Sequence, residues 1–411
     1  MPISARTRPR AGTKPTPIAS PTPAAPERRP LGPHAGRMAR AAQAAAGLGC
    51  SHALITNPID VGYLTGFTGG DSYLLLDAAA PASGPAAGPG AAPRALIISD
   101  FRFDEELEPT RALAEVFIRK GMMSEAVGSV LAERRVTALG VQPEHMTLAV
   151  RRWLTKKTPG LRVVEAPGLV AALRARKDAA EVALIRKAVR VAQDALEHTL
   201  GAVGAALRRG KAMTEAAIAA ELEHAMRQGG SQKPSFDTIV AAGANGSLPH
   251  YRAGSVRYRA GRPLLIDWGA TVGGYHSDMS RVVAFGRWPA KIAELYRVVL
   301  EAHQLAAAAL APGLTTERAD AIARGHIAAA GFGERFGHGL GHGIGLDVHE
   351  DPRLSHMAPP RPLEEGMVVT IEPGIYVPGL GGVRIEDDYL ITQRGAKNLC
   401  TLPKDIGWAT R

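Results

Sequence analysis

The chain has 411 residues, of which 45% are hydrophobic and 21% are charged, which is the composition of an ordinary soluble globular protein of two or three domains. The formal net charge is +10, but residues 1–37 hold seven basic residues and one acidic residue, a net of +6, which leaves +4 for the rest. The body of the protein is therefore barely basic, which excludes the charge pattern of a nucleic-acid-binding surface, and no nucleic-acid partner is expected.

The first segment, residues 1–37, also contains nine prolines. Such a basic, proline-rich stretch predicts a disordered tail that buries nothing, so its deletion is expected to leave folding and turnover unchanged. No apolar run has the length that a signal peptide or a membrane span requires, which predicts a cytoplasmic protein without membrane contact. Cys50 and Cys400 match no metal or redox spacing and are expected to be free thiols.

Residues 38–168 follow with alternating strand and helix patterns, which indicate an α/β N-terminal domain. The pattern predicts helices at residues 38–48, 124–133 and 147–155, and strands at residues 52–56, 61–67, 73–76 and 95–99. Residues 78–93 consist of Ala, Pro and Gly with one Ser, which predicts a low-complexity surface loop without chemistry.

From residue 169 to residue 411 long helical patterns dominate. Asp178 and Glu181 form the signature of a capping box at the start of the first helix. Two later segments resemble each other, because each contains a Gly, a Thr-Glu helix start and an alanine-rich helix that ends at Gly: residues 208–230 and 310–332. This internal duplication predicts a second domain of two pseudo-symmetric halves with the site between them.

Residues 336–350, FGHGLGHGIGLDVHE, hold three of the thirteen histidines among five glycines. The glycines forbid an ordinary helix and allow backbone and ligand to approach closely. Neutral imidazole is the commonest nitrogen ligand of a divalent metal, and its second nitrogen can move a proton near neutral pH. His338, His342 and His349 are therefore candidate metal-ligating or catalytic residues.

Two aspartates flank a predicted β-hairpin. Asp267 ends an apolar strand pattern, and Asp278 follows the turn signal Gly273-Gly274. A hairpin centred on Val272 and Gly273 would place the two carboxylates nearly opposite each other. Buried carboxylates that face each other repel, and a cation would relieve that repulsion.

Two glutamates have the same character. Glu372 ends an apolar strand pattern before a Pro-Gly turn, and Glu386 ends the next one. Four acids at strand ends together with the histidines predict a metal site, and mostly carboxylate oxygens with a single imidazole favour manganese over a thiolate-bound zinc. Five ligands are too many for one tetrahedral zinc and suit two metal ions with bridging carboxylates.

The order of these motifs resembles one known family. Asp267 and Asp278, then GHGLGHGIGLDVHEDP, TIEPGIY and GGVRIEDD, look like aminopeptidase P and prolidase, the Xaa-Pro metallopeptidases with the pita-bread fold. The stretch NPIDVGYLTGFTGGDSYLLL also resembles their creatinase-like N-terminal domain, so the similarity runs from about residue 38 to the C-terminus. The resemblance implies an α/β chain with that N-terminal domain at residues 38–168 and a pita-bread catalytic domain at residues 169–411.

The resemblance also implies two divalent ions per chain, expected to be Mn²⁺ with Co²⁺ or Zn²⁺ as alternatives. Their ligands would be Asp267, Asp278, His342, Glu372 and Glu386. Asp278 and Glu386 would bridge the two ions. Glu372 would also take the proton of the attacking water.

Four further residues match functional positions of the family. His349 matches a histidine that steadies the tetrahedral intermediate or passes a proton to the leaving nitrogen. His338 and His250 match histidines that bind the substrate and its amine end. Arg384 matches an arginine that orients the bridging glutamate.

The implied reaction is hydrolysis of Xaa-Pro bonds in proline-containing peptides by a homodimer. Aminopeptidase P, which releases the residue before proline from longer peptides, is favoured, and prolidase, which cuts Xaa-Pro dipeptides, is the alternative. The long N-terminal domain disfavours methionine aminopeptidase, and the complete ligand set disfavours metal-free creatinase. A non-catalytic pita-bread binding module is disfavoured because such modules generally lose ligands and none is missing.

Overall fold

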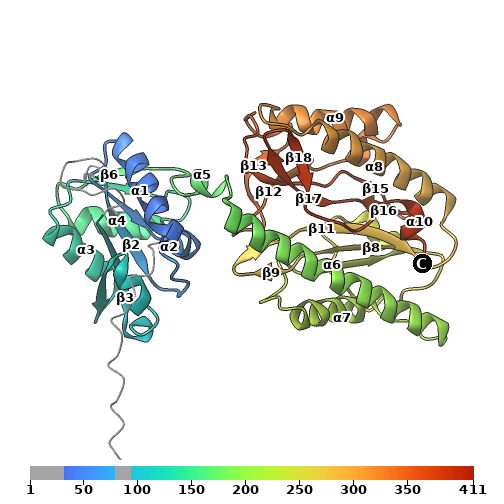
Figure 1. Ribbon diagram of the computed structural model, residues 1–411, viewed down its shortest axis with the longest axis horizontal. Helices are drawn as coiled ribbons and strands as arrows, with labels where there is room; N and C mark the ends of the chain where they lie inside the picture. Colours follow the sequence, from blue (N-terminus) through green and yellow to red (C-terminus); the bar gives the residue numbers. More distant parts are fainter. Residues whose placement is uncertain (1–31, 79–93) are drawn as a thin grey trace, which may run out of the picture.

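The computed structural model describes residues 32–78 and 94–411, which form two bodies joined by the short helix α5 (Ala171–Arg174) (Figure 1). The N-terminal body contains one six-stranded sheet in the order β4-β3-β2-β1-β5-β6. β1 pairs antiparallel with β2 and parallel with β5, so the sheet is mixed. The strands are β1 (His52–Ile55), β2 (Tyr73–Asp77), β3 (Ala95–Asp100), β4 (Glu115–Arg119), β5 (Ala138–Val141) and β6 (Arg162–Glu165).

Helices cover both faces of this sheet, because its strand side chains alternate between two apolar cores. Leu74 and Leu76 pack in the core that includes the first two helices, whereas Leu75 packs in the core that includes the next two. These helices are α1 (Gly32–Gly47), α2 (Pro58–Thr65), α3 (Met123–Glu133) and α4 (Leu148–Lys157).

Two expectations for this region are wrong. Residues 61–67, predicted as a strand, lie mostly in α2, because the Asn57 side chain caps the helix and Pro58 occupies its first turn. The tail was expected to extend to residue 37, but α1 begins at Gly32, and Arg37 is buried in ion pairs with Asp178 and Glu181. Residues 1–31 and most of the predicted loop, residues 79–93, lie outside the described residues.

The C-terminal body contains two main sheets and two short hairpins. The first sheet has the order β11-β8-β7 and the second the order β13-β12-β14-β17-β18, while β9 pairs with β10 and β15 with β16. The strands are β7 (Ile239–Ala242), β8 (Pro263–Trp268), β9 (Thr271–Val272), β10 (Tyr275–His276), β11 (Met279–Ala284), β12 (Gly341–Gly343), β13 (Glu350–Leu354), β14 (Val368–Ile371), β15 (Gly374–Val377), β16 (Gly381–Arg384), β17 (Asp387–Thr392) and β18 (Gly395–Asn398).

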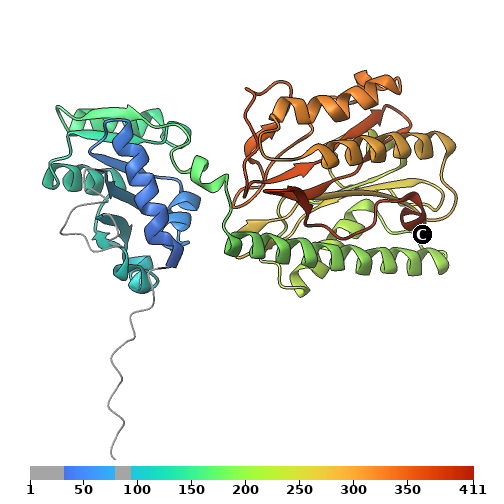
Figure 2. The same ribbon diagram turned by 45° about the horizontal axis from the view of Figure 1, so that its top comes forward.

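Two helix pairs pack against these strands, one for each half of the internal duplication (Figures 1 and 2). The first pair contacts β7, β9 and β10, and the second contacts β13, β14, β15, β16 and β18. Asp178 and Glu181 form the predicted capping box at the start of the first helix. The first pair is α6 (Ala179–Arg208) and α7 (Glu215–Gln228), and the second pair is α8 (Ala290–Ala309) and α9 (Thr316–Ala329). A short helix, α10 (Ile406–Ala409), lies near the C-terminus.

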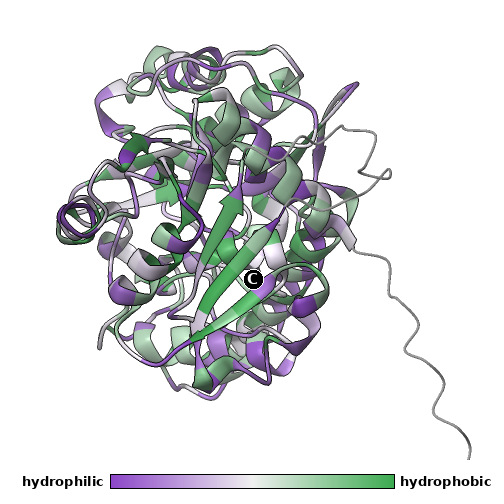
Figure 3. Cartoon of the chain, turned by 90° about the vertical axis from the view of Figure 1, so that its left-hand side faces the viewer, coloured by the Kyte–Doolittle hydropathy of each residue, from purple (hydrophilic) through white to green (hydrophobic). Residues whose placement is uncertain are grey.

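The expected mixed α/β architecture is thus confirmed. Seen along the long axis, apolar strands lie at the centre of the view, and polar residues are frequent on the surrounding helices and loops (Figure 3). Within the described residues, no helix is both long and apolar enough to cross a bilayer. Cys50 and Cys400 are buried free thiols, as expected.

Candidate metal centre

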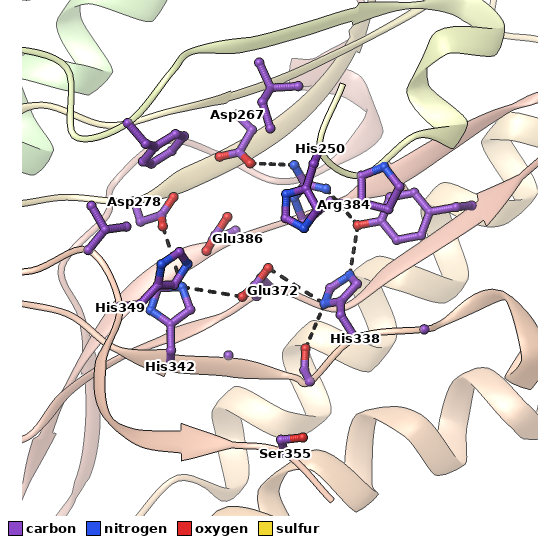
Figure 4. Close-up of a pocket in the computed structure, with 18 of the residues that line it drawn as sticks. His250, Asp267, Asp278, His338, His342, His349, Ser355, Glu372, Arg384 and Glu386 are labelled. Atoms are coloured by element: carbon purple, nitrogen blue, oxygen red, sulfur yellow. Dashed lines mark hydrogen bonds and ion pairs between the residues drawn. The ribbon is translucent and has the colours of Figure 1, made fainter. Parts of the chain in front are cut away.

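The hairpin that carries the two aspartates turns one residue later than expected. Gly273 and Gly274 both have positive φ, 58° and 81°, and form the turn that only glycine adopts easily. Asp267 therefore lies opposite Ser280, and not opposite Asp278. The expected pairing is wrong by two positions, and an even shift keeps side chains on the same face of the sheet. Both carboxylates consequently still point toward one centre (Figure 4).

The third candidate ligand, His342, lies in β12, where flanking glycines allow close packing of the backbone. A Cβ atom on Gly341 would lie 2.1 Å from the carbonyl oxygen of Thr370, and one on Gly343 would lie 2.2 Å from that of Asp351. No other residue type fits these two positions without moving neighbouring strands. The glycine spacing thus places β12 between β13 and β14, with the imidazole of His342 at the cavity.

The structure brings three of the five predicted ligands into one cluster. Donor atoms of Asp278, His342 and Glu386 all lie within 4.8 Å of one another. Glu372 follows β14. Nε2 of His342 lies 3.6 Å from Oε1 of Glu372 and 3.7 Å from Oδ2 of Asp278. Asp267 lies at the edge of this cluster, and its Oδ1 is buried without a hydrogen-bond partner in the described structure.

Burial and mutual repulsion change the protonation of this cluster. The pKa values of Asp278 and Glu372 are raised well above the ordinary range by burial and then by neighbouring carboxylates, Glu386 foremost. Burial, together with the charge of Asp267, raises the pKa of Glu386 to about 8. Burial lowers the pKa of His342 to about 3, so its imidazole is neutral and offers a lone pair. Crowded carboxylates, an unpartnered oxygen and a neutral imidazole fit divalent cations.

Arg384 binds the cluster in a way that the sequence did not indicate. Its guanidinium donates to Oδ2 of Asp267 at 2.5 Å, to the hydroxyl of Ser280 at 2.7 Å and to the hydroxyl of Tyr376 at 2.7 Å. Ser280 in turn donates to Oε2 of Glu386 at 2.8 Å. Among the described residues, Arg384 therefore hydrogen-bonds Asp267 directly and is linked to the expected glutamate, Glu386, through Ser280.

Ser280 and Tyr376 are the polar neighbours that sequence reasoning missed. Tyr376 stands inside the TIEPGIY motif, and Ser280 lies two residues after Asp278 in a strand pattern, so both could have been found by asking which polar side chains share a face with a ligand.

The remaining predicted histidines line the same cavity, whose volume is about 1070 Å³. Nε2 of His338 lies 2.9 Å from the hydroxyl of Tyr376, and its Nδ1 lies 2.8 Å from the carbonyl oxygen of Gly339. The ring of His349 packs edge-on against that of His342 with centroids 4.4 Å apart. His250 is exposed at the cavity wall. Their functional roles stay predictions.

The raised pKa values predict how the stability of the metal-free protein depends on pH. A carboxyl with a folded pKa above its unfolded value binds more protons in the native state, so its contribution to stability falls as pH rises between the two values. Because the pKa of Glu386 is about 8, the melting temperature in chelator should fall by about 1 to 2 °C between pH 7 and pH 8.

Scanning calorimetry with and without added Mn²⁺ measures this effect. Histidines with a lowered pKa act in the opposite direction, because roughly a quarter of each unfolded-state imidazole is still protonated at pH 7. Asp278 and Glu372, whose pKa values are also raised, add to the fall. Added Mn²⁺ should reverse the trend, because it binds the deprotonated carboxylates. A melting temperature that rises from pH 7 to pH 8 in chelator would contradict the assignment.

Comparisons with known proteins assign a family to each of the two bodies. Residues 183–393 match metallopeptidase family M24, and residues 37–176 match the creatinase/prolidase N-terminal domain. An uncharacterised peptidase of Bacillus subtilis (strain 168) is 36% identical over 359 residues, which cover 87% of this chain and 96% of that one.

Solved structures extend these similarities. The structure of an Xaa-Pro dipeptidase from Bacillus anthracis is similar with a TM-score of 0.82 and 33% identity over 90% of this chain and 99% of that one. The structure of an X-Pro aminopeptidase from Thermotoga maritima MSB8 is similar with a TM-score of 0.76 and 32% identity over 88% of this chain and 98% of that one.

Proposed function

This chain belongs to metallopeptidase family M24, and from that membership we propose that it hydrolyses the peptide bond on the N-terminal side of proline. The resemblance to aminopeptidase P and prolidase is confirmed, as is a fold that joins a creatinase/prolidase N-terminal domain to an M24 catalytic domain. A bond to proline is a tertiary amide with no N–H for a protease to bind, so its hydrolysis needs strong activation of the carbonyl group.

What supports a metal-dependent reaction is the buried cluster of Asp278, His342 and Glu386, whose donor atoms lie within 4.8 Å of one another. We propose that Glu372 and Asp267 complete the ligand set for two divalent ions, and that these are Mn²⁺ because oxygen donors predominate. When bound, such ions would polarise the carbonyl group and lower the pKa of a water molecule. The expected homodimer and cytoplasmic location stay predictions.

The protein's own side chains would move the protons. Glu372, whose Oε1 lies 3.6 Å from Nε2 of His342, would accept the proton of the attacking water. His349 stands at the exposed edge of the cluster and would protonate the proline nitrogen as it leaves. His338, fixed between Tyr376 and Gly339, lies on the side of Glu372 away from His349 and would contact the substrate there (Figure 4). The exposed His250 lies nearby.

For substrate length we propose dipeptides, because a cationic side chain stands beside the cluster. Arg353 lines the cavity, is the register partner of His342 in β13, and its charge lowers the pKa of both His342 and His349. A guanidinium at this position suits the free carboxylate of a C-terminal proline, which only a dipeptide presents one residue from the cleaved bond.

The aminopeptidase favoured by the sequence is the second candidate. The cavity of about 1070 Å³ exceeds what a dipeptide fills, which would leave room for a longer peptide. A Mn²⁺-supplemented assay that compares Gly-Pro with Ala-Pro-Ala separates the two. We expect Gly-Pro to be the better substrate, and faster cleavage of Ala-Pro-Ala would assign the aminopeptidase.

Arg353→Ala is expected to raise KM for Gly-Pro by about 10- to 100-fold, because one charge-assisted hydrogen bond to a carboxylate is lost. The matched control is Arg335→Ala, which removes another arginine of the cavity wall. Steady-state kinetics on both variants measure the effect. An equal rise in KM for the two variants would contradict a specific role of Arg353.

A further inference from the structure

A buried ionic cluster joins the N-terminal domain to the chain segment that carries His349. Arg174 stands at its centre, on the short helix α5 between the two bodies, and is only 5% exposed. Its guanidinium donates to Oδ1 of Asp60 in α2 at 2.7 Å, to Oδ2 of Asp347 at 2.6 Å and to Oε1 of Glu350 at 2.5 Å. One side chain thus binds three carboxylates from two domains.

Two of the three carboxylates are fixed by further contacts. Asp60 is 1% exposed and also accepts a hydrogen bond of 2.5 Å from the amide of Gln142. Glu350 accepts from Nζ of Lys177 at 3.0 Å and from the backbone N–H of Asp347 at 3.0 Å. The positive charges of Lys177 and Arg174 lower the pKa of Glu350 to about 2, so this carboxylate is ionised at neutral pH.

Asp347 and Glu350 bracket His349 within one tightly closed segment. The backbone N–H of Gly345 donates to the carbonyl oxygen of Asp347 at 3.0 Å, and a Cβ atom on Gly345 would lie 2.8 Å from Oε2 of Glu350. The side chain of Leu346 packs against apolar cores of both domains. Residues 345–350 are therefore part of the domain interface as well as of the cavity wall.

The imidazole of His349 has no hydrogen-bond partner within the described part of the chain, and it contacts the ring of His342 by its edge. Apart from that ring contact, no polar contact of the imidazole within the described residues fixes where His349 stands. Its position depends on the backbone of residues 345–350, and the carboxylates on either side of it hold that backbone.

We propose that Arg174 is a positioning residue for His349, and that through it the N-terminal domain forms part of the catalytic apparatus. This inference rests on the proposed function for its kinetic consequence only, because the structural consequence, an ordered segment 345–350, is independent of any substrate. A planar guanidinium can bind three carboxylates at once with a fixed geometry, whereas a lysine ammonium at the same position is a single point charge.

The test uses Arg174→Lys, which keeps the charge and so protects folding, alongside Arg174→Ala. Arg176→Ala is the matched control, since Arg176 lies two residues along the chain with a side chain that is 60% exposed. Hydrogen exchange of the full-length protein should be faster in residues 345–350 of Arg174→Lys and unchanged in Arg176→Ala. Unchanged exchange in that segment in both Arg174 variants would overturn the proposal.

Kinetics supply a second readout that a purely structural role would not move. Arg174→Lys should lower kcat by about 10- to 100-fold with metal content unchanged, because a misplaced catalytic group loses that much rate. In a His349→Ala background the same change should lower kcat by less than about 2-fold, since there is no imidazole left to position. Multiplicative effects would overturn the proposal. If the wild-type protein cleaved no Xaa-Pro peptide, the proposed function would fail, and the exchange measurement would still decide the role of Arg174.

Discussion

His342→Ala is expected to lose bound metal and peptidase activity together. Nδ1 of His342 lies 3.0 Å from the carbonyl oxygen of Gly343 and donates to it, which leaves the lone pair of Nε2 directed toward Asp278 and Glu372. Without this nitrogen the cluster retains only carboxylates, which repel one another. Metal affinity should fall by more than about 100-fold, because even changes to residues that merely support a ligand cost 10- to 100-fold.

Metal analysis of the purified protein and titration with Mn²⁺ measure this result. Wild-type protein should contain more than one divalent ion per chain, and exhaustive chelation should abolish cleavage of Gly-Pro. Activity that survived chelation would point to a metal-free, creatinase-like mechanism. Full metal content in His342→Ala would remove His342 from the ligand set.

The second expected result is that His349→Ala keeps its metal and lowers kcat by roughly 10²- to 10⁴-fold, the usual contribution of a positioned acid or base. His349 lies at the mouth of the cavity with part of its ring open to solvent, and partial burial followed by the charge of Arg353 lowers its pKa, so a neutral imidazole is available near pH 7 to exchange protons with substrate or solvent. The ring of His349 contacts the ring of His342 edge-on, but His349 is not among the three residues whose donor atoms form the cluster.

The two alanine variants form a matched pair, because each removes one imidazole from rings whose centroids are 4.4 Å apart. Metal content and kcat are measured for both under the same conditions. Equal metal loss in the two variants would make His349 a ligand and overturn the separation of roles. A lower melting temperature of His349→Ala with normal kcat for the folded fraction would make it a packing residue.

Local sequence signals predicted many helices and strands. They failed where the same residues are compatible with two different local structures. The capping box at Asp178 and three of the six strands of the N-terminal sheet, β1, β2 and β3, were predicted, since caps and alternation act within a few residues, whereas β4, β5 and β6 were missed. Residues 61–67 were predicted as a strand, yet Asn57 and Pro58 just before them start a helix. The turn of the Asp267 hairpin lies one residue later than expected, which changes the partner of Asp267 from Asp278 to Ser280. Both Val272-Gly273 and Gly273-Gly274 could have formed the turn.

The sequence alone determined which chemical groups the centre contains. Acids at strand ends and a histidine between glycines identify a donor set, because residue type and strand period are local properties. Tertiary structure alone decided which atoms meet: Arg384 binds Asp267 across 117 positions of sequence, and Arg174 binds Glu350 across 176. Contacts at such separations depend on how whole sheets and domains pack, and no spacing rule within a motif encodes them.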